Sequence, residues 1–297
     1  MVTRKGLLMV AGAGICWATT GLFGTLLFRE GIDPVNVAST RNALAALIFL
    51  LYLVITQPQL LRLDKNQLLT LLPGSLVGVT LFNLFYMNAI DEAGMSTAVV
   101  LLYTSPVFAV LLSRLFLKEP LTLHKVASLG LAFGGVILVV EAFELSALID
   151  NYTGILLGLA SGVSFALLSV FGKHLTGSLD RLTASFYLLF LGALFLSFIR
   201  APWNGLVEAA ASPGLLAALA AMVIISTFLS HFLYLYGLSY LQAGRASIAV
   251  SVEPAAAILL AFIFLGERLS LLQYVGVLLV LAAVFLLRLE RDSDSGD

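Results

Sequence analysis

The sequence predicts an all-α membrane protein in which ten transmembrane helices form two inverted five-helix repeats around a central cavity. Three observations predict this fold: an apolar composition, ten apolar stretches of membrane-spanning length, and a match between the two halves of the chain. Hydrophobic residues make up 60% of the 297 residues, charged residues make up only 11%, and the mean hydropathy is +1.05. Since a soluble domain carries about 25% charged residues, most of this surface is expected to face lipid.

Charged and turn-forming residues divide the chain into ten apolar stretches of about 20 residues, the length of helix that crosses about 30 Å of hydrocarbon. The predicted spans are 6–28, 34–56, 68–90, 96–117, 124–140, 154–175, 182–199, 214–240, 244–265 and 270–288. They leave only short loops and tails, so no domain is expected outside the bilayer. The first span, with Arg4 and Lys5 before it, also resembles a cleavable signal peptide, but it is long enough to cross the membrane.

Local chemistry supports two of these assignments. Asp33 followed by Pro34 is typical of an N-cap with proline in the first helical position, so the second span is expected to begin there. Gly154, Gly158 and Gly162 recur every four residues along the sixth span, a pattern that allows helices to approach closely.

The distribution of basic residues predicts the orientation of the chain. Of the 16 Lys and Arg residues, 12 lie nearer the side of the amino terminus. The other four are Arg29, Arg41, Arg200 and Arg268. Because basic residues are enriched on the cytoplasmic side of a membrane, both termini are expected to be cytoplasmic, in a plasma membrane such as the bacterial inner membrane.

The two halves of the chain, 1–148 and 149–297, match at a constant offset of 148 residues without gaps. The matched pairs include Gly6 and Gly154, Gly14 and Gly162, Tyr86 and Tyr234, Pro106 and Pro254, and Glu119 and Glu267. Because each unit has five spans, an odd number, the second copy must enter the membrane from the opposite side. Inverted repeats are a recurrent design of secondary transporters, in which two similar halves expose a central site to each face in turn.

A family resemblance follows from the end of each half. The segments 105–121 (SPVFAVLLSRLFLKEPL) and 253–269 (EPAAAILLAFIFLGERL) each contain a proline-bearing helix followed by Leu-x-Glu-x-Leu. Together with the ten spans and the segment around Arg41, they resemble the EamA-type branch of the drug/metabolite transporter superfamily. The resemblance implies a basket of helices around a central cavity and the export of amino acids or other small metabolites. Exporters of aromatic amino acids belong to this group.

Two prolines are expected to interrupt helices at corresponding places in the two halves. Pro106 and Pro254 cannot donate a backbone hydrogen bond and should free the carbonyl groups of Leu102 and Val250. In hydrocarbon these oxygens need a partner, and paired helix interruptions mark binding sites in transporters. A plain structural kink, with a Ser or Thr side chain satisfying the carbonyl group, is the alternative.

The same offset pairs side chains that a lipid-facing helix would not need. These pairs are Trp17 and Phe165, Asn83 and His231, Tyr86 and Tyr234, and Tyr103 and Ser251. Trp17 and Phe165 lie near mid-span, too deep for an interfacial aromatic belt. The pairs are therefore candidates for the wall of a cavity with aromatic gates on both sides, and aromatic packing is the alternative.

Glu253 is the sharpest single candidate because it lies within the ninth span, where an ionised carboxylate costs about 2.5–3.5 kcal/mol. It is expected either to exchange a proton during transport or, as a neutral acid, to bond a carbonyl group beside Pro254. Arg41 and His231 are the other ionisable residues at depth, and Arg41 has a side chain that can snorkel outward. Glu119 and Glu267 lie at helix ends and are interpreted as structural.

Several classes of function have no support. Cys16 is the only cysteine, which excludes an internal disulfide and a cysteine-pair metal site. The chain lacks His-Glu-x-x-His, Gly-x-Ser-Gly and phosphate-loop motifs, so no catalytic residue, metal or cofactor is expected. A net charge of −1 gives no reason to expect a nucleic-acid partner.

The sequence thus predicts a secondary transporter that exports small metabolites through the lipid bilayer by alternating access. Its expected substrates are small zwitterions or cations with an apolar side chain, most of all aromatic and large neutral amino acids. Two alternatives remain open: a transporter of drugs or of metabolites such as nucleotide sugars and sugar phosphates, and a polytopic membrane enzyme. The sequence leaves open the coupling ion, the direction of flux and the oligomeric state.

Overall fold

The computed structural model describes residues 2–93, 95–140, 152–265 and 270–289, and within these ranges the chain is helical. Six helices are long and apolar enough to cross a membrane, and four more apolar helices are shorter. The shorter ones are Ser105–Phe116, Leu123–Val139, Arg181–Ser197 and Leu271–Leu286. The predicted all-α fold is confirmed. Six of the ten predicted spans correspond to helices of membrane-spanning length, and the shorter apolar helices overlap the other four.

The first half of the chain contains five spans, of which the third and fourth are divided into shorter helices. Its elements are α1 (Val2–Arg29), α2 (Pro34–Thr56), η1 (Pro58–Leu61), α3 (Lys65–Ser75), η2 (Leu76–Leu81), α4 (Phe82–Ala93), α5 (Met95–Leu102), α6 (Ser105–Phe116) and α7 (Leu123–Val140). The span formed by α3, η2 and α4 has a π-helical middle, and a turn separates α5 from α6.

The second half repeats this plan and adds one short helix. Its elements are α9 (Tyr152–Ser178), α10 (Arg181–Ser197), α11 (Asn204–Ala209), α12 (Pro213–Ala221), η3 (Met222–Leu229), α13 (Ser230–Leu238), α14 (Ala243–Val250), α15 (Val252–Leu260), η4 (Ala261–Leu265) and α16 (Leu271–Leu289). The predicted boundary between the halves, after residue 148, lies outside the described residues.

Helix starts follow the local chemistry of the sequence. The Asp33 carboxylate accepts hydrogen bonds from the backbone N–H groups of Val35 and Asn36 at 2.8 and 2.9 Å, and Pro34 opens α2 as predicted. Asp64 and Gln67 form a reciprocal capping box at the start of α3. These caps satisfy backbone donors that the first helical turn leaves without partners.

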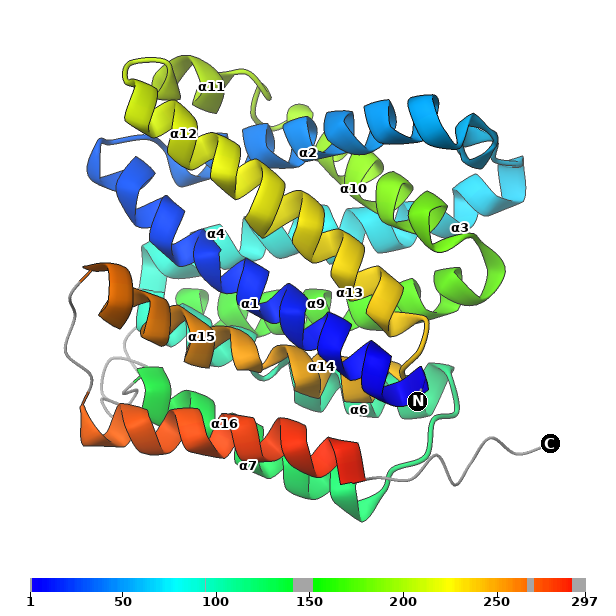
Figure 1. Ribbon diagram of the computed structural model, residues 1–297, viewed down its shortest axis with the longest axis vertical. Helices are drawn as coiled ribbons and strands as arrows, with labels where there is room; N and C mark the ends of the chain where they lie inside the picture. Colours follow the sequence, from blue (N-terminus) through cyan, green and yellow to red (C-terminus); the bar gives the residue numbers. More distant parts are fainter. Residues whose placement is uncertain (1, 94, 141–151, 266–269, 290–297) are drawn as a thin grey trace.

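The two halves are interleaved in the bundle (Figure 1). The first helix of each half packs against the other half: α1 contacts α13, α14 and α15, whereas α9 contacts α4, α5 and α6. The helices α7 and α16 pack against each other along one edge, where a Cβ atom on Gly276 would lie only 2.7 Å from the Gly135 carbonyl oxygen. The first turn of α1 and the last turn of α16 lie at the same end of the bundle (Figure 1).

Two glycines at matched positions allow these crossings. A Cβ atom on Gly14 would lie 3.0 Å from the Val250 carbonyl oxygen, and one on Gly162 would lie 3.0 Å from that of Leu101. Each glycine therefore lets the first helix of one half approach the interrupted helix of the other half. Gly158 faces Leu101 in the same way, which fits the close packing expected for the sixth span.

Candidate functional site

The interruptions in the fourth and ninth spans occur at matched positions. The α5 helix ends at Leu102, two turn residues follow, and α6 begins at Ser105 with Pro106 in its first turn. The α14 helix ends at Val250, one residue intervenes, and α15 begins at Val252 with Pro254 as its third residue. The chain thus breaks each helix a few residues before its proline.

Two side chains at these breaks are buried without a partner. The Tyr103 hydroxyl and the Ser251 hydroxyl, which the offset of 148 residues pairs, have no hydrogen-bond partner. The Ser247 hydroxyl, one helical turn before Ser251, is buried in the same way. Buried polar groups in proteins are almost always hydrogen-bonded. The unpaired hydroxyl groups at the two breaks are therefore open to a polar ligand or water.

An aromatic cluster is formed by side chains of α1, α9 and α13. The Trp17 ring contacts Phe165 edge-on at 5.7 Å between centroids, His231 at 5.6 Å and Tyr234 at 5.1 Å. These residues come from α1, α9 and α13, so both halves contribute. Trp17 and Phe165, which match at the constant offset, are brought into direct contact although they are 148 residues apart in the sequence.

Phe82 extends this cluster towards Tyr86. Its ring stacks on Tyr86 at 5.8 Å and tilts against Phe165 at 5.5 Å. The sequence interpretation did not single out Phe82. The only signal for it was its position four residues before Tyr86 on the same helical face.

Tyr234 differs from Tyr86 and Tyr103 because its hydroxyl group is satisfied within the protein. It lies 2.5 Å from the Ser169 hydroxyl on α9, and the whole side chain is buried. Tyr234 therefore fixes α13 against α9 and presents its ring to Trp17.

Asn83 and His231 make matched backbone contacts in the two π-helical spans. The Asn83 amide donates to the Val79 carbonyl at 2.7 Å, and His231 Nδ1 lies 2.8 Å from the Thr227 carbonyl. Each side chain contacts the carbonyl oxygen four residues earlier, which lies in η2 for Asn83 and in η3 for His231. π-helical turns are rare and occur frequently at functional sites.

Arg41 points into the bundle and not towards the membrane surface. Its guanidinium group donates to the Thr227 hydroxyl and to the Asn83 side-chain oxygen, both at 3.3 Å. Of the two interpretations of Arg41, a residue at depth or a side chain that snorkels outward, the structure agrees with the first, because polar groups on η3 and α4 are its partners. Arg41 therefore adds a positive charge beside Asn83.

Glu253 lies at the start of α15 and faces the polar residues around it. Its carboxyl group is within electrostatic range of Arg41, Tyr86 and Tyr103. The Tyr103 hydroxyl approaches this carboxyl group but does not meet the distance and angle of a hydrogen bond, and it remains unpaired. The side chains of Arg41, Tyr86, His231 and Glu253 are half-buried, so each keeps some surface for a small solute.

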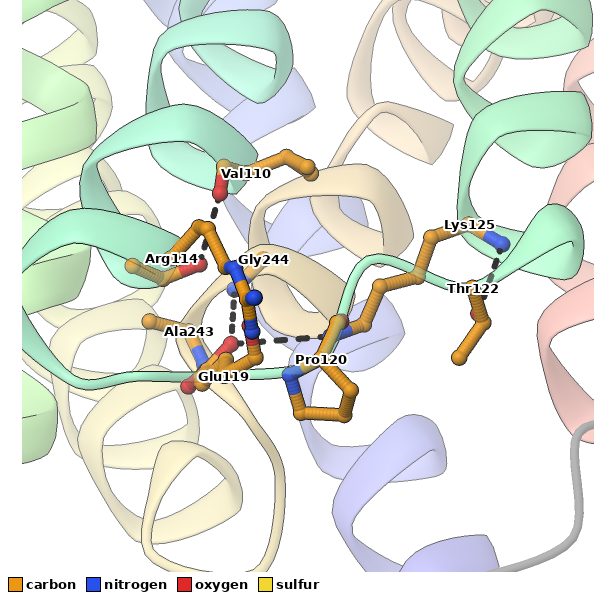
Figure 2. Close-up of polar contacts among 9 residues, drawn as sticks. Val110, Arg114, Glu119, Pro120, Thr122, Lys125, Ala243 and Gly244 are labelled. Atoms are coloured by element: carbon orange, nitrogen blue, oxygen red, sulfur yellow. Dashed lines mark hydrogen bonds and ion pairs between the residues drawn. The ribbon is translucent and has the colours of Figure 1, made fainter.

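A second polar cluster lies at one end of the bundle, where the loop 117–122 passes the start of α14 (Figure 2). The Glu119 carboxylate accepts hydrogen bonds from the backbone N–H groups of Ala243 at 2.7 Å and Gly244 at 3.3 Å. It also pairs with buried Lys125 at 3.7 Å, and Lys125 donates to the Pro120 carbonyl at 2.8 Å. Glu119 thus caps a helix of the other half, which agrees with a structural role, whereas Glu267 lies outside the described residues.

An open pocket of about 490 Å³ adjoins this second cluster. It is lined by Leu117, Glu119, Lys173, His174, Gly177, Ser178 and Gln242. These residues belong to helix ends and loops, so the pocket lies at the end of the bundle and does not contain the aromatic cluster. Within the described ranges no three His, Cys, Asp or Glu side chains group as a metal site.

Comparisons with known proteins agree with this architecture. The model of the EamA-like transporter family matches residues 4–141 and again 152–289. An uncharacterized transporter of Archaeoglobus fulgidus is 26% identical over 261 residues, which cover 88% of this chain and 90% of that protein. The uncharacterized inner membrane transporter YicL of Salmonella typhimurium is 27% identical over 292 residues, which cover 97% and 96%.

A solved crystal structure shares the fold at 15% sequence identity. Its TM-score is 0.79, and the similarity covers 95% of this chain and 96% of the other. The family model matches both halves, and the relatives at similar length are named as transporters. The chain therefore belongs to the EamA-like transporter family of membrane proteins.

Proposed function

We propose that this protein exports amino acids with aromatic or large apolar side chains across the plasma membrane by alternating access. The observation that carries the proposal is the composition of the central site. An aromatic surface formed by Trp17, Phe82 and Phe165 lies beside one cation, Arg41, and one acid, Glu253. Pockets for small molecules combine an apolar lining with a few polar groups that fix orientation.

The inverted arrangement of the halves supports alternating access. The contacts of α1 with α14 and α15, and of α9 with α5 and α6, repeat the same crossing in opposite orientations. Two equivalent crossings allow the halves to exchange conformations, which opens the site to each side of the membrane in turn. Export is proposed because the sequence resembles a group that includes exporters of aromatic amino acids.

The charges argue against a sugar phosphate or nucleotide sugar as the main substrate. A phosphate group is usually held by several cations or bidentate arginines. Arg41 is the cation that contacts the central site in the described part of the chain, and its charge is balanced in part by Glu253. A substrate without net charge fits this balance better.

Transport is tested with purified protein in liposomes loaded with labelled phenylalanine. We expect counterflow that unlabelled phenylalanine, tryptophan, leucine and methionine reduce strongly, and glutamate and a sugar phosphate reduce weakly. Best competition by the sugar phosphate would overturn the substrate class. Chemical turnover of a substrate without movement of label would indicate an enzyme.

Orientation is tested by cysteine labelling from outside intact cells, on a Cys16→Ser background. Asn66 and Ala211 are exposed at opposite ends of the bundle, after the second and seventh spans. With cytoplasmic termini, we expect an impermeant thiol reagent to label Ala211→Cys and not Asn66→Cys. The reverse pattern would place the termini outside and would exchange the inner and outer faces of the site.

A further inference from the structure

Two opposite charges lie near the aromatic cluster without forming an ion pair. Arg41 donates to Asn83, the residue after Phe82. The backbone nitrogen of Glu253 lies 3.5 Å from a Cβ atom placed on Gly14, about one turn before Trp17. Arg41 on α2 belongs to the first half of the chain, and Glu253 on α15 belongs to the second. They interact electrostatically. Within the described residues, however, the ion pair closer than 4.0 Å is that of Lys125 with Glu119. The charged atoms of Arg41 and Glu253 are therefore more than 4.0 Å apart, and each is open to a group of opposite charge on a solute.

Arg41 has donors to spare. A guanidinium group carries five N–H donors, and the partners of Arg41 are two neutral oxygens, each at 3.3 Å. Charge-assisted hydrogen bonds to a carboxylate are shorter, about 2.7–2.9 Å, and stronger. Thr227 and Asn83 therefore orient the guanidinium group but leave its preference for a carboxylate unsatisfied.

Glu253 follows a helix break, and the hydroxyl groups at the two breaks are also unsatisfied. The Tyr103 hydroxyl at the break between α5 and α6 and the Ser251 hydroxyl at the break between α14 and α15 are buried without partners, and Ser247 adds a third. An ammonium group carries three donors and no acceptor. A carboxylate together with hydroxyl oxygens can receive all three.

From this arrangement we propose that Arg41 binds the carboxylate of the substrate and Glu253 binds its ammonium group, so that the site recognises both charges of an α-amino acid. The inference rests on the proposed function and names the residues that bind the ammonium and carboxylate groups of the substrate. The side chain of the substrate then lies on Trp17 and Phe165. Because the two charges come from different halves, a bound amino acid links the halves across the centre of the protein.

The test removes each charge from the protein and from the ligand in turn. Trp203, the other tryptophan, is exposed in α11's N-cap position, so Trp203→Phe leaves Trp17 as the fluorescent reporter of binding. The ligands are phenylalanine, phenethylamine, which lacks the carboxylate, and 3-phenylpropionate, which lacks the ammonium group. Before mutation we expect phenylalanine to bind at least about tenfold more tightly than either analogue, the size expected for a lost hydrogen bond to a charged group.

Arg41→Gln and Glu253→Gln should then lose affinity for different ligands. Arg41→Gln should weaken phenylalanine and 3-phenylpropionate at least about tenfold and leave phenethylamine nearly unchanged. Glu253→Gln should weaken phenylalanine and phenethylamine and leave 3-phenylpropionate nearly unchanged. Arg41→Lys keeps the charge and should restore part of the preference, which guards against loss of folding in Arg41→Gln. Arg62→Gln and Glu30→Gln remove exposed charges and should change no affinity.

The outcomes separate this inference from the proposed function. If phenylalanine neither binds nor moves in the unaltered protein, the amino-acid proposal fails and the assignment of Arg41 and Glu253 fails with it. If phenylalanine binds and is transported but each variant weakens all three ligands by the same factor, or none of them, the assignment alone is overturned.

Discussion

Two glutamates in this protein, Glu119, which is buried, and Glu253, which is half-buried, lie in opposite situations. Glu119 accepts two backbone N–H groups at the start of α14 and pairs with Lys125. Glu253 lies among hydroxyl groups without partners and is separated from its nearest cation. Burial of a charge is costly unless the charge is paired and hydrogen-bonded. A carboxylate whose hydrogen-bond acceptors are satisfied by its own chain supports the fold. A carboxylate without such partners is available to a ligand.

The largest expected effect is the loss of stability when the Glu119 carboxylate is removed. Glu119→Ala removes the cap of α14 and takes the carboxylate away from the ammonium group of Lys125, which is 1% exposed. Breaking a buried ion pair by removing one partner costs about 3–5 kcal/mol, so the melting temperature in detergent should fall sharply. The double variant Glu119→Ala with Lys125→Met should recover much of this loss. If it is as unstable as the sum of the two single variants, the pair is not coupled.

The next effect tests the crossings that join the halves. Gly14→Ala and Gly162→Ala place a methyl group within 3.0 Å of backbone oxygens at the two helix breaks. Overpacking of this kind costs about 1–3 kcal/mol, and we expect the transport rate to fall more than substrate affinity because the breaks must move past these glycines. Gly134→Ala is the matched control, since nothing lies within 4 Å of its added methyl group. Equal transport rates for Gly14→Ala and Gly134→Ala would show that this crossing has no role in transport.

A smaller effect concerns the aromatic surface of the open site. Trp17→Ala should weaken phenylalanine relative to alanine by about tenfold, since loss of apolar contact in a pocket changes discrimination by about 1–3 kcal/mol. Competition for labelled substrate in liposomes measures the ratio. Phe49→Ala is the control, because Phe49 is fully buried and packs against Phe228 in a different cluster. Unchanged selectivity in Trp17→Ala would show that the substrate does not rest on this ring.

Much of the fold could be predicted from the sequence because its causes are local. Charged residues and the Asp33–Pro34 cap mark helix ends, and the apolar runs between them have the length of a membrane span. The inverted repeat followed from a constant offset and the odd number of spans. The break near each proline was expected, but its form as two separate helices depends on the close approach of Gly14 and Gly162, which only the packed bundle supplies.

The site was less predictable because it is built between the halves. The offset singled out Trp17 and Phe165, yet it gave no signal for Phe82, whose matched residue is Ser230. The direction of Arg41 depends on Thr227 and Asn83 in other spans, and no pattern within its own helix reveals it. The partner of Glu119 likewise lies in the second half, although its place at a helix end already indicated a structural role.

The contrast between the two glutamates is tested most directly by thermal melting with and without phenylalanine. A ligand that binds the folded protein at 100 times its dissociation constant stabilises it by about 2.7 kcal/mol. We predict that Glu119→Gln melts below the unaltered protein but keeps its stabilisation by phenylalanine. Glu253→Gln should melt at or above the temperature of the unaltered protein and lose most of that stabilisation. A Glu253→Gln protein that is destabilised yet fully stabilised by phenylalanine would contradict the account.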